Sequence, residues 1–276
     1  MRRRVGQAAL YLLATLVSLL FVYPFWWMAV SAFRSQQAIL AAPLRLFPER
    51  FDLAAFHDIL AIGGTSLLSY AANSVALTLA ATVLGVAATG LAAYALFRSP
   101  HLPLFGTVRA AFLLTIMYPN MLLVIPLYFV TFKLGLLGSY LGIILVLSLV
   151  PLVFFIFVQF FTSIPREMVE AASVDGAREW QVFLLVIVPV ARPVIATCVL
   201  IAFLLNWKQW FPVMVLSTDT ATHTLPVALV SLNGEYGINF QATMALATLT
   251  VVPVLAIFLA AQKHIIGGFM AGAVKG

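Results

Sequence analysis

The residues with the clearest potential for chemistry form a charged segment, at about residues 162–189, in a chain that is otherwise apolar. Four of the nine acidic residues lie there within thirteen positions: Glu167, Glu170, Asp175 and Glu179. Ala171 and Ala172 follow Glu170, and such small side chains leave room for another surface to approach the carboxylate closely. The segment therefore favours a docking contact. The alternative is an amphipathic connector on a membrane surface, although such helices more usually carry lysine and arginine on their polar face.

Other kinds of chemistry have no support in the sequence. The chain contains no His-Glu-x-x-His, no Gly-x-Ser-x-Gly and no cluster of metal-ligand residues. It also lacks the Gly-x-x-x-x-Gly-Lys-Ser/Thr loop that binds nucleotide phosphates. We therefore predict no catalytic residue, no metal site and no cofactor in this chain. The single cysteine, Cys198, lies in an apolar run and excludes an internal disulfide framework.

The composition places the chain in a lipid environment. Of its 276 residues, 63% are hydrophobic and only 9% are charged, and the mean hydropathy is +1.09. A soluble domain has about 25% charged residues, so this chain cannot cover its surface with polar groups. The net charge of +6 comes from basic residues scattered between apolar runs. That distribution indicates membrane topology and not a nucleic-acid partner.

The apolar runs predict an all-α membrane protein with six transmembrane helices in a single domain. A bilayer core requires about 20 apolar residues in a helix. We expect the spans at about residues 8–30, 70–97, 111–132, 141–161, 190–216 and 242–261. The first run follows Arg2, Arg3 and Arg4, as a signal peptide would. It is too long for one and has no small-x-small cleavage site close behind it, so we expect it to remain uncleaved.

The orientation follows from the lysine and arginine residues. With six spans, one side would carry ten of them: Arg2, Arg3, Arg4, Arg98, Arg109, Arg166, Arg178, Arg192, Lys263 and Lys275. The other side would carry four: Arg34, Arg45, Arg50 and Lys133. Ten against four predicts a multi-pass protein of the plasma membrane, with both termini and segment 162–189 in the cytoplasm.

Within segment 162–189 the sequence predicts a helix, a turn and a second helix. Pro165 suits the first position of a helix, and acidic residues near that end are favourable to the helix dipole. Asp175-Gly176 is a strong signal for chain reversal. The second helix would run from Ala177 to Leu185, and Pro189 would close the segment.

A few polar residues within the predicted spans are candidates for a translocation pathway. Lys208 is the one clear ionisable residue there, and such groups are usually functional; alternatively it lies near the outer interface and extends its amine towards water. Asn206 and Gln209 would bind a solute hydroxyl or pair neighbouring helices. Asn120 follows Pro119, where a broken helix can line a cavity.

The charged segment resembles a known motif. Glu170-Ala171-Ala172-x-x-Asp175-Gly176-Ala177, followed by Phe183 and Pro189, is similar to the EAA loop of binding-protein-dependent ABC importer permeases. The similarity is closest to the carbohydrate branch, the maltose-permease-like inner-membrane subunits. It extends along nearly the whole chain, through Tyr23-Pro24-Phe25, Asn73-Ser74, Leu123 to Tyr128, Ser163 to Glu167, and Gly267 to Gly276.

The resemblance implies partners and residue roles. Segment 162–189 would contain the coupling helix for a cytoplasmic ATPase, with Glu170 making the charged contact. Ala171 and Ala172 would permit close approach, and Gly176 would provide the turn, with Asp175 and Pro189 in the same motif. The chain would pair with a homologous permease subunit, two ABC ATPases that bind ATP and Mg, and an extracytoplasmic binding protein. The tail from Gly267 to Gly276 would be a second ATPase contact.

Two further expectations follow. Asn233, Gly234 and Glu235 lie in a loop at 217–241 with turn-forming chemistry, which we expect to face outside and contact the binding protein.

Lys208 departs from the family, which usually has asparagine there, and this leaves the identity of the substrate open. An ion-coupled secondary transporter is the alternative class, but it would need carboxylates or histidines inside the membrane. All nine acidic residues lie outside the predicted spans.

Overall fold

The computed structural model describes residues 2–101, 103–117, 120–235 and 239–273. Its contacts divide the chain into two compact units. The first unit comprises residues 1–69 and 228–253, and the second comprises residues 70–227 and 254–276.

The first unit contains a long helix followed by short elements. These are α1 (Arg2–Ser31), α2 (Gln36–Ala41), α3 (Ala54–Asp58), and a hairpin of β1 (Ala61–Ile62) and β2 (Thr65–Ser66). Arg34 is buried and donates hydrogen bonds to the carbonyls of Ala38 and Ala42 at 2.6 and 2.7 Å. A cation at the end of α2 satisfies carbonyls that have no partner within the helix.

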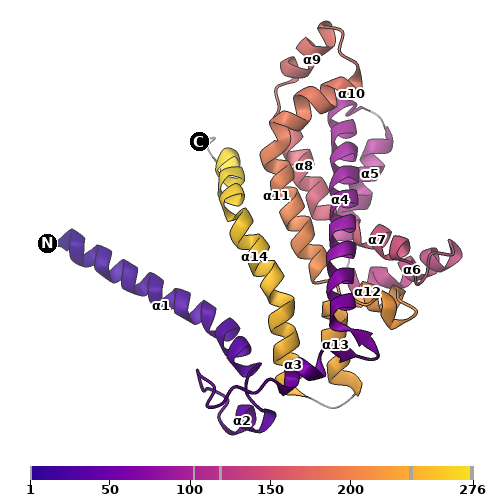
Figure 1. The fold of residues 1–276 in the computed structure, drawn as a ribbon. Helices are drawn as coiled ribbons and strands as arrows, with labels where there is room; N and C mark the ends of the chain where they lie inside the picture. The colour runs from indigo at the N-terminus through magenta and orange to yellow at the C-terminus, as the bar shows by residue number, and fades with distance from the viewer. Residues whose placement is uncertain (1, 102, 118–119, 236–238, 274–276) are drawn as a thin grey trace. The chain divides into compact units, whose positions relative to one another are not determined.

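The second unit is built from helices. Its elements are α4 (Leu67–Arg98), α5 (Pro103–Met117), α6 (Asn120–Lys133), α7 (Tyr140–Leu147), α8 (Pro151–Thr162), α9 (Arg166–Val174), α10 (Glu179–Gln181), the π-helix η1 (Val182–Ile187), α11 (Val188–Trp207), α12 (Phe211–Leu216) and the 3₁₀ turn η2 (Thr220–Thr222). The helices α13 (Leu225–Glu235) and α14 (Phe240–Ala273) complete the chain. Figure 1 shows α4, α8 and α11 side by side, with α9 beyond their ends.

Four helices in the described ranges are long and apolar enough to cross a membrane. They cover Gly6–Ser31, Leu67–Arg98, Glu179–Trp207 and Phe240–Ala261. The pair α7 and α8, bent by 47°, makes a fifth span if it is counted as one. Where we expected the span at 111–132, there are two shorter apolar helices, and residues 118 and 119 between them lie outside the described ranges. The number six therefore stays a prediction.

Prolines account for the departures from the predicted span limits. Pro151 begins α8, and a residue before proline avoids the helical conformation, so the expected span at 141–161 is broken after Leu147. Pro189 does not close a helix as expected, because residues 179–207 are continuously helical. The π-helix just before it widens the turn, which accommodates a residue that has no N–H and whose ring crowds the preceding turn.

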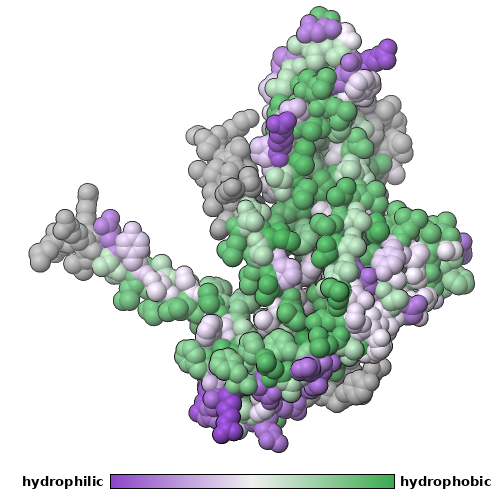
Figure 2. Space-filling model, in the orientation of Figure 1, coloured by the Kyte–Doolittle hydropathy of each residue, from purple (hydrophilic) through white to green (hydrophobic). Residues whose placement is uncertain are grey.

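The core of the second unit is aromatic. Phe154, Phe157 and Phe161 of α8 are at most 2% exposed, and Tyr94 of α4 packs edge-on against Phe161 at a centroid distance of 6.2 Å. Such edge-to-face pairs add stabilisation beyond the area they bury. Figure 2 shows a largely hydrophobic surface along these helices and hydrophilic residues around α9. One side of α9 therefore packs on this core, while the polar residues of α9 remain accessible.

Candidate functional site

The helix α9 gives the charged segment a defined orientation. Val169 is 1% exposed and belongs to the aromatic core, and Ala172, one turn later, is half-buried against the same core. The opposite face carries Glu167, Glu170 and Val174, and Val174 is 86% exposed. These positions follow the spacing of one helix face. The helix is therefore anchored by one side and exposes a row of acidic and small apolar groups on the other.

The two alanines of the motif have different environments. Ala171 is exposed beside Glu170, whereas Ala172 packs inwards on the core. The small size of Ala171 leaves the exposed face flat, while the small size of Ala172 lets α9 lie close to the helices beneath it. The sequence alone did not predict that these two alanines differ in burial, because they are identical neighbours in the motif.

Asp175 and Gly176 end the helix as the sequence predicted. Asp175 is the C-cap residue, and the Ala177 N–H donates to the Ala172 carbonyl at 3.1 Å across the turn. Gly176 has a φ of +81°, which side-chain-bearing residues rarely adopt. A Cβ at Gly176 would meet nothing within 4 Å. The requirement for glycine here is therefore one of backbone conformation and not of space.

After the turn, the chain is fixed by a charged contact that sequence reasoning did not identify. The carboxylate of Glu179 accepts hydrogen bonds from Arg98 Nε at 3.1 Å and from the Tyr94 hydroxyl at 3.0 Å, and it forms an ion pair with Arg98. The ring of Phe183 lies 4.8 Å from that of Tyr94. The start of α10 is thus joined to the end of α4. Arg98 and Glu179 are 81 positions apart, so no pattern of spacing predicts their contact. Their opposite charges are the only signal in the sequence.

Asn206 and Gln209 lie beside a second feature, a cavity of about 480 Å³. It is bounded by α5, α6, the break between α7 and α8, and the break between α11 and α12. Irregular backbone at membrane depth is found where it is buried or lines a cavity. Asn206 is 4% exposed and donates to Thr82 of α4 at 3.3 Å. The amide of Asn206 therefore pairs two helices at the edge of this cavity.

The remaining pathway and loop candidates are not brought into one site. Lys208 is the exposed C-cap residue of α11, in the break before α12, and so is not inside a continuous span. Asn120 begins α6, but its side chain is outside the described part of the chain. Asn233, Gly234 and Glu235 form the end of α13 and not the expected turn; their side chains also lie outside the described part.

The expected loop at 217–241 is more ordered than its composition suggested. Asn73 of α4 donates to the carbonyls of Ala221 and His223 at 2.7 and 2.9 Å, and its own oxygen accepts from the Tyr140 hydroxyl. Ser74 accepts the N–H of Leu225, the first residue of α13, at 2.8 Å. The Asn73-Ser74 pair thus satisfies backbone groups of this segment that would otherwise be costly to bury.

The long apolar helices, with the polar helix α9 exposed beyond the ends of α4, α8 and α11, define a multi-pass helical membrane protein. Residues 81–268 match the family described as the binding-protein-dependent transport system inner membrane component. The chain belongs to this family and is an inner-membrane permease component of an ABC importer. Such components work with an ATPase and a substrate-binding protein and are not catalytic themselves. Nothing in the match supports an ion-coupled secondary transporter.

Individual relatives match the chain over its full length. It is 34% identical over 279 residues to the lactose transport system permease protein LacG of Rhizobium radiobacter, covering 100% of this chain and 98% of that protein. It is 28% identical to the arabinooligosaccharides transport system permease protein AraQ of Bacillus subtilis, covering 99% and 97%. The fold is similar, with a TM-score of 0.78 and 21% identity over 94% and 96%, to a chain of a bacterial ABC transporter that imports alginate.

Proposed function

We propose that this chain is one of two permease subunits of an ATP-driven importer for a sugar or oligosaccharide. The observation that carries the proposal is its full-length similarity to permeases named for lactose and arabinooligosaccharide transport. A second homologous permease would complete the translocation pathway. Two cytoplasmic ATPase subunits would bind ATP and Mg and hydrolyse the ATP, and an extracytoplasmic binding protein would deliver the sugar.

In this proposal the exposed face of α9 contacts the ATPase. Glu170 makes the charged contact, and the small side chain of Ala171 allows the ATPase surface to approach. Asp175 and Gly176 end the helix, while Ala172 and Pro189 hold the segment against the membrane helices. Support comes from the burial of Val169 beneath the same helix, which would transmit a displacement of α9 to the aromatic core.

The proposed orientation places α9 and both termini in the cytoplasm. The ten-to-four distribution of lysine and arginine supports it, and so does the requirement that α9 meet an ATP-consuming partner. The tail from Gly267 to Gly276 would lie on the same side as a second ATPase contact. The segment around Asn233 to Glu235 would then lie outside, accessible to the binding protein.

For the sugar pathway we propose the cavity beside Asn206 and Gln209. Amide groups can donate to and accept from sugar hydroxyls, and apolar walls with a few polar groups are typical of ligand sites. Lys208 at the helix break and Asn120 at the start of α6 are weaker candidates for the same pathway.

The coupling role can be tested in the assembled importer with Glu170→Ala. If Glu170 makes a buried charged contact with the ATPase, we expect a loss of transport of at least about tenfold, since truncating one member of such a pair costs about 2–5 kcal/mol. Asp58→Ala is the matched control, because Asp58 is an exposed carboxylate of α3 and is not part of α9. Membrane content and binding-protein-stimulated ATP hydrolysis are measured alongside. Normal transport and normal stimulation in Glu170→Ala would reject the coupling assignment.

A further inference from the structure

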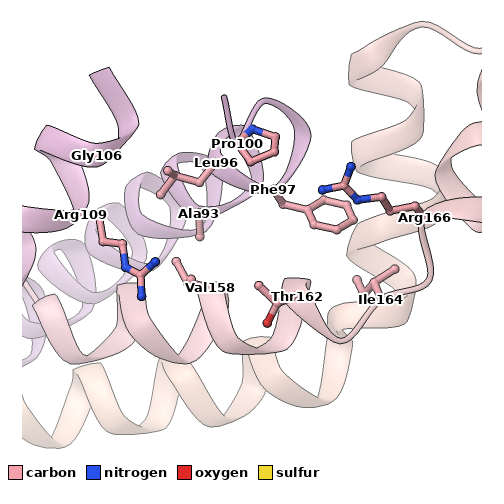
Figure 3. A pocket seen from close by; sticks show the side chains of 10 residues that line it. All are labelled: Ala93, Leu96, Phe97, Pro100, Gly106, Arg109, Val158, Thr162, Ile164 and Arg166. Atoms are coloured by element: carbon pink, nitrogen blue, oxygen red, sulfur yellow. The ribbon is translucent and has the colours of Figure 1, made fainter. Parts of the chain in front are cut away.

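A separate cavity of about 350 Å³ lies where α4 and α8 end and α5 begins, near the start of α9. Figure 3 shows the side chains of Arg109 and Arg166 at its two ends, with Leu96, Phe97 and Val158 between them. The cavity is therefore amphipathic, with two guanidinium groups separated by an apolar wall. It shares no lining residue with the cavity beside Asn206.

Both arginines lack an anionic partner in the part of the chain that the structure describes. The carboxylate of Glu179 is paired with Arg98, and neither Arg109 nor Arg166 has a hydrogen bond or an ion pair among the described residues. Guanidinium groups bind phosphate oxygens with strong, charge-assisted hydrogen bonds. Two unpaired arginines at one cavity thus favour an anionic ligand.

The position of the two arginines favours a lipid anion over a soluble one. Arg166 begins α9, at the polar end of the helices, whereas Arg109 lies six residues inside α5. At about 1.5 Å per residue, that is about 9 Å along the helix. Leu96, Phe97 and Val158 are only partly buried, so the wall between the arginines can contact a ligand. A soluble phosphate would leave this apolar wall unused.

We propose that this cavity binds an anionic phospholipid, with its headgroup phosphate at Arg166, the ester carbonyls of its glycerol towards Arg109 and an acyl chain along the apolar wall. Basic pockets between membrane helices are suited to phospholipid headgroups. The lipid would lie against the first residue of α9. The proposal requires only that the chain is a membrane protein and does not depend on the ATPase-coupling role.

The test measures phosphatidylglycerol retained by this chain, by native mass spectrometry of the assembled importer in detergent. A surface arginine contributes about 1 kcal/mol to anionic-lipid binding. We therefore expect Arg109→Gln and Arg166→Gln each to lower retention about fivefold, and the double variant about 25-fold. Arg192→Gln is the matched control, because Arg192 is an exposed arginine of α11 that does not line the cavity. Phosphatidylcholine should be retained weakly by the wild type and by all four variants.

A second variant blocks the cavity without removing charge. A Cβ at Gly106, which lines the cavity, would meet nothing within 4 Å, so a side chain can begin there without a clash, and Gly106→Leu would extend it into the cavity. Leucine also favours the helix over glycine. We expect it to lower phosphatidylglycerol retention while both arginines remain.

Three results would overturn the proposal. The first is wild-type retention of phosphatidylglycerol in the double arginine variant. The second is complete displacement of the lipid by inorganic phosphate, which would indicate a site for a soluble anion. The third is unchanged lipid retention with loss of the co-purifying ATPase, which would assign the two arginines to that partner.

Discussion

Gly85 of α4 is a position where a single added methyl group should destabilise the packing of the apolar helices. A Cβ there would lie 2.5 Å from the carbonyl oxygen of Ser148, in the break between α7 and α8. A backbone oxygen cannot rotate away as a side chain could, so α4 and the break would have to separate. Overpacking of this kind costs about 1–3 kcal/mol.

Gly90, on the same helix, provides the matched control. A Cβ there would lie 3.5 Å from the ring of Phe157, which is an ordinary contact. Both substitutions to alanine gain about 1 kcal/mol of helix propensity, and this gain cancels in the comparison. Gly85→Ala should therefore be less stable than Gly90→Ala by about 2 kcal/mol, which corresponds to about 4–8 °C in Tm for a chain of this size.

The single cysteine makes the measurement direct. Cys198 is fully buried in the aromatic core of the second unit, so a thiol-reactive fluorophore reports its exposure as the purified protein is heated in detergent. The two variants and the wild type are compared at the same protein and detergent concentrations. Equal melting temperatures for Gly85→Ala and Gly90→Ala would refute the close approach of α4 to the carbonyl of Ser148.

Two further predictions concern charged groups. Arg98→Ala and Glu179→Ala should each lower the free energy of unfolding by about 1 kcal/mol, because the Glu179 side chain is 62% exposed and solvent screens the pair. The double variant should lose less than the sum of the two single losses. Strictly additive shifts in melting temperature would contradict the contact. Burial lowers the pKa of His223, against an opposing effect of Asp219. Folding therefore favours the neutral imidazole, so stability should be complete above about pH 6.5 and fall as the pH drops below it. His223→Gln should remove the loss of stability that protonation of His223 causes at low pH. If the pH profile of thermal unfolding is unchanged in this variant, His223 is not the cause of that loss.

Local signals in the sequence predicted the charged segment well. Asp175-Gly176 specifies a helix end through backbone preferences alone, and the structure has that turn with Gly176 at positive φ. Pro189 does not end the helix as predicted, because the turn before it is widened. The π-helix at Val182–Ile187 provides that widening. It packs against α9, and contacts between separate helices leave no local pattern in the sequence.

The amino-acid sequence by itself determined the class of the protein. Its apolar composition requires lipid as solvent, its basic residues favour one orientation, and its Glu-Ala-Ala motif resembles that of one family. Only the tertiary structure decided which residues meet. Ala172 packs against the core, whereas Ala171 is exposed. Glu179 contacts Tyr94 and Arg98. Arg109 and Arg166 line one cavity. The physical reason is that composition and spacing act along the chain, whereas contacts between helices depend on how their surfaces pack in three dimensions.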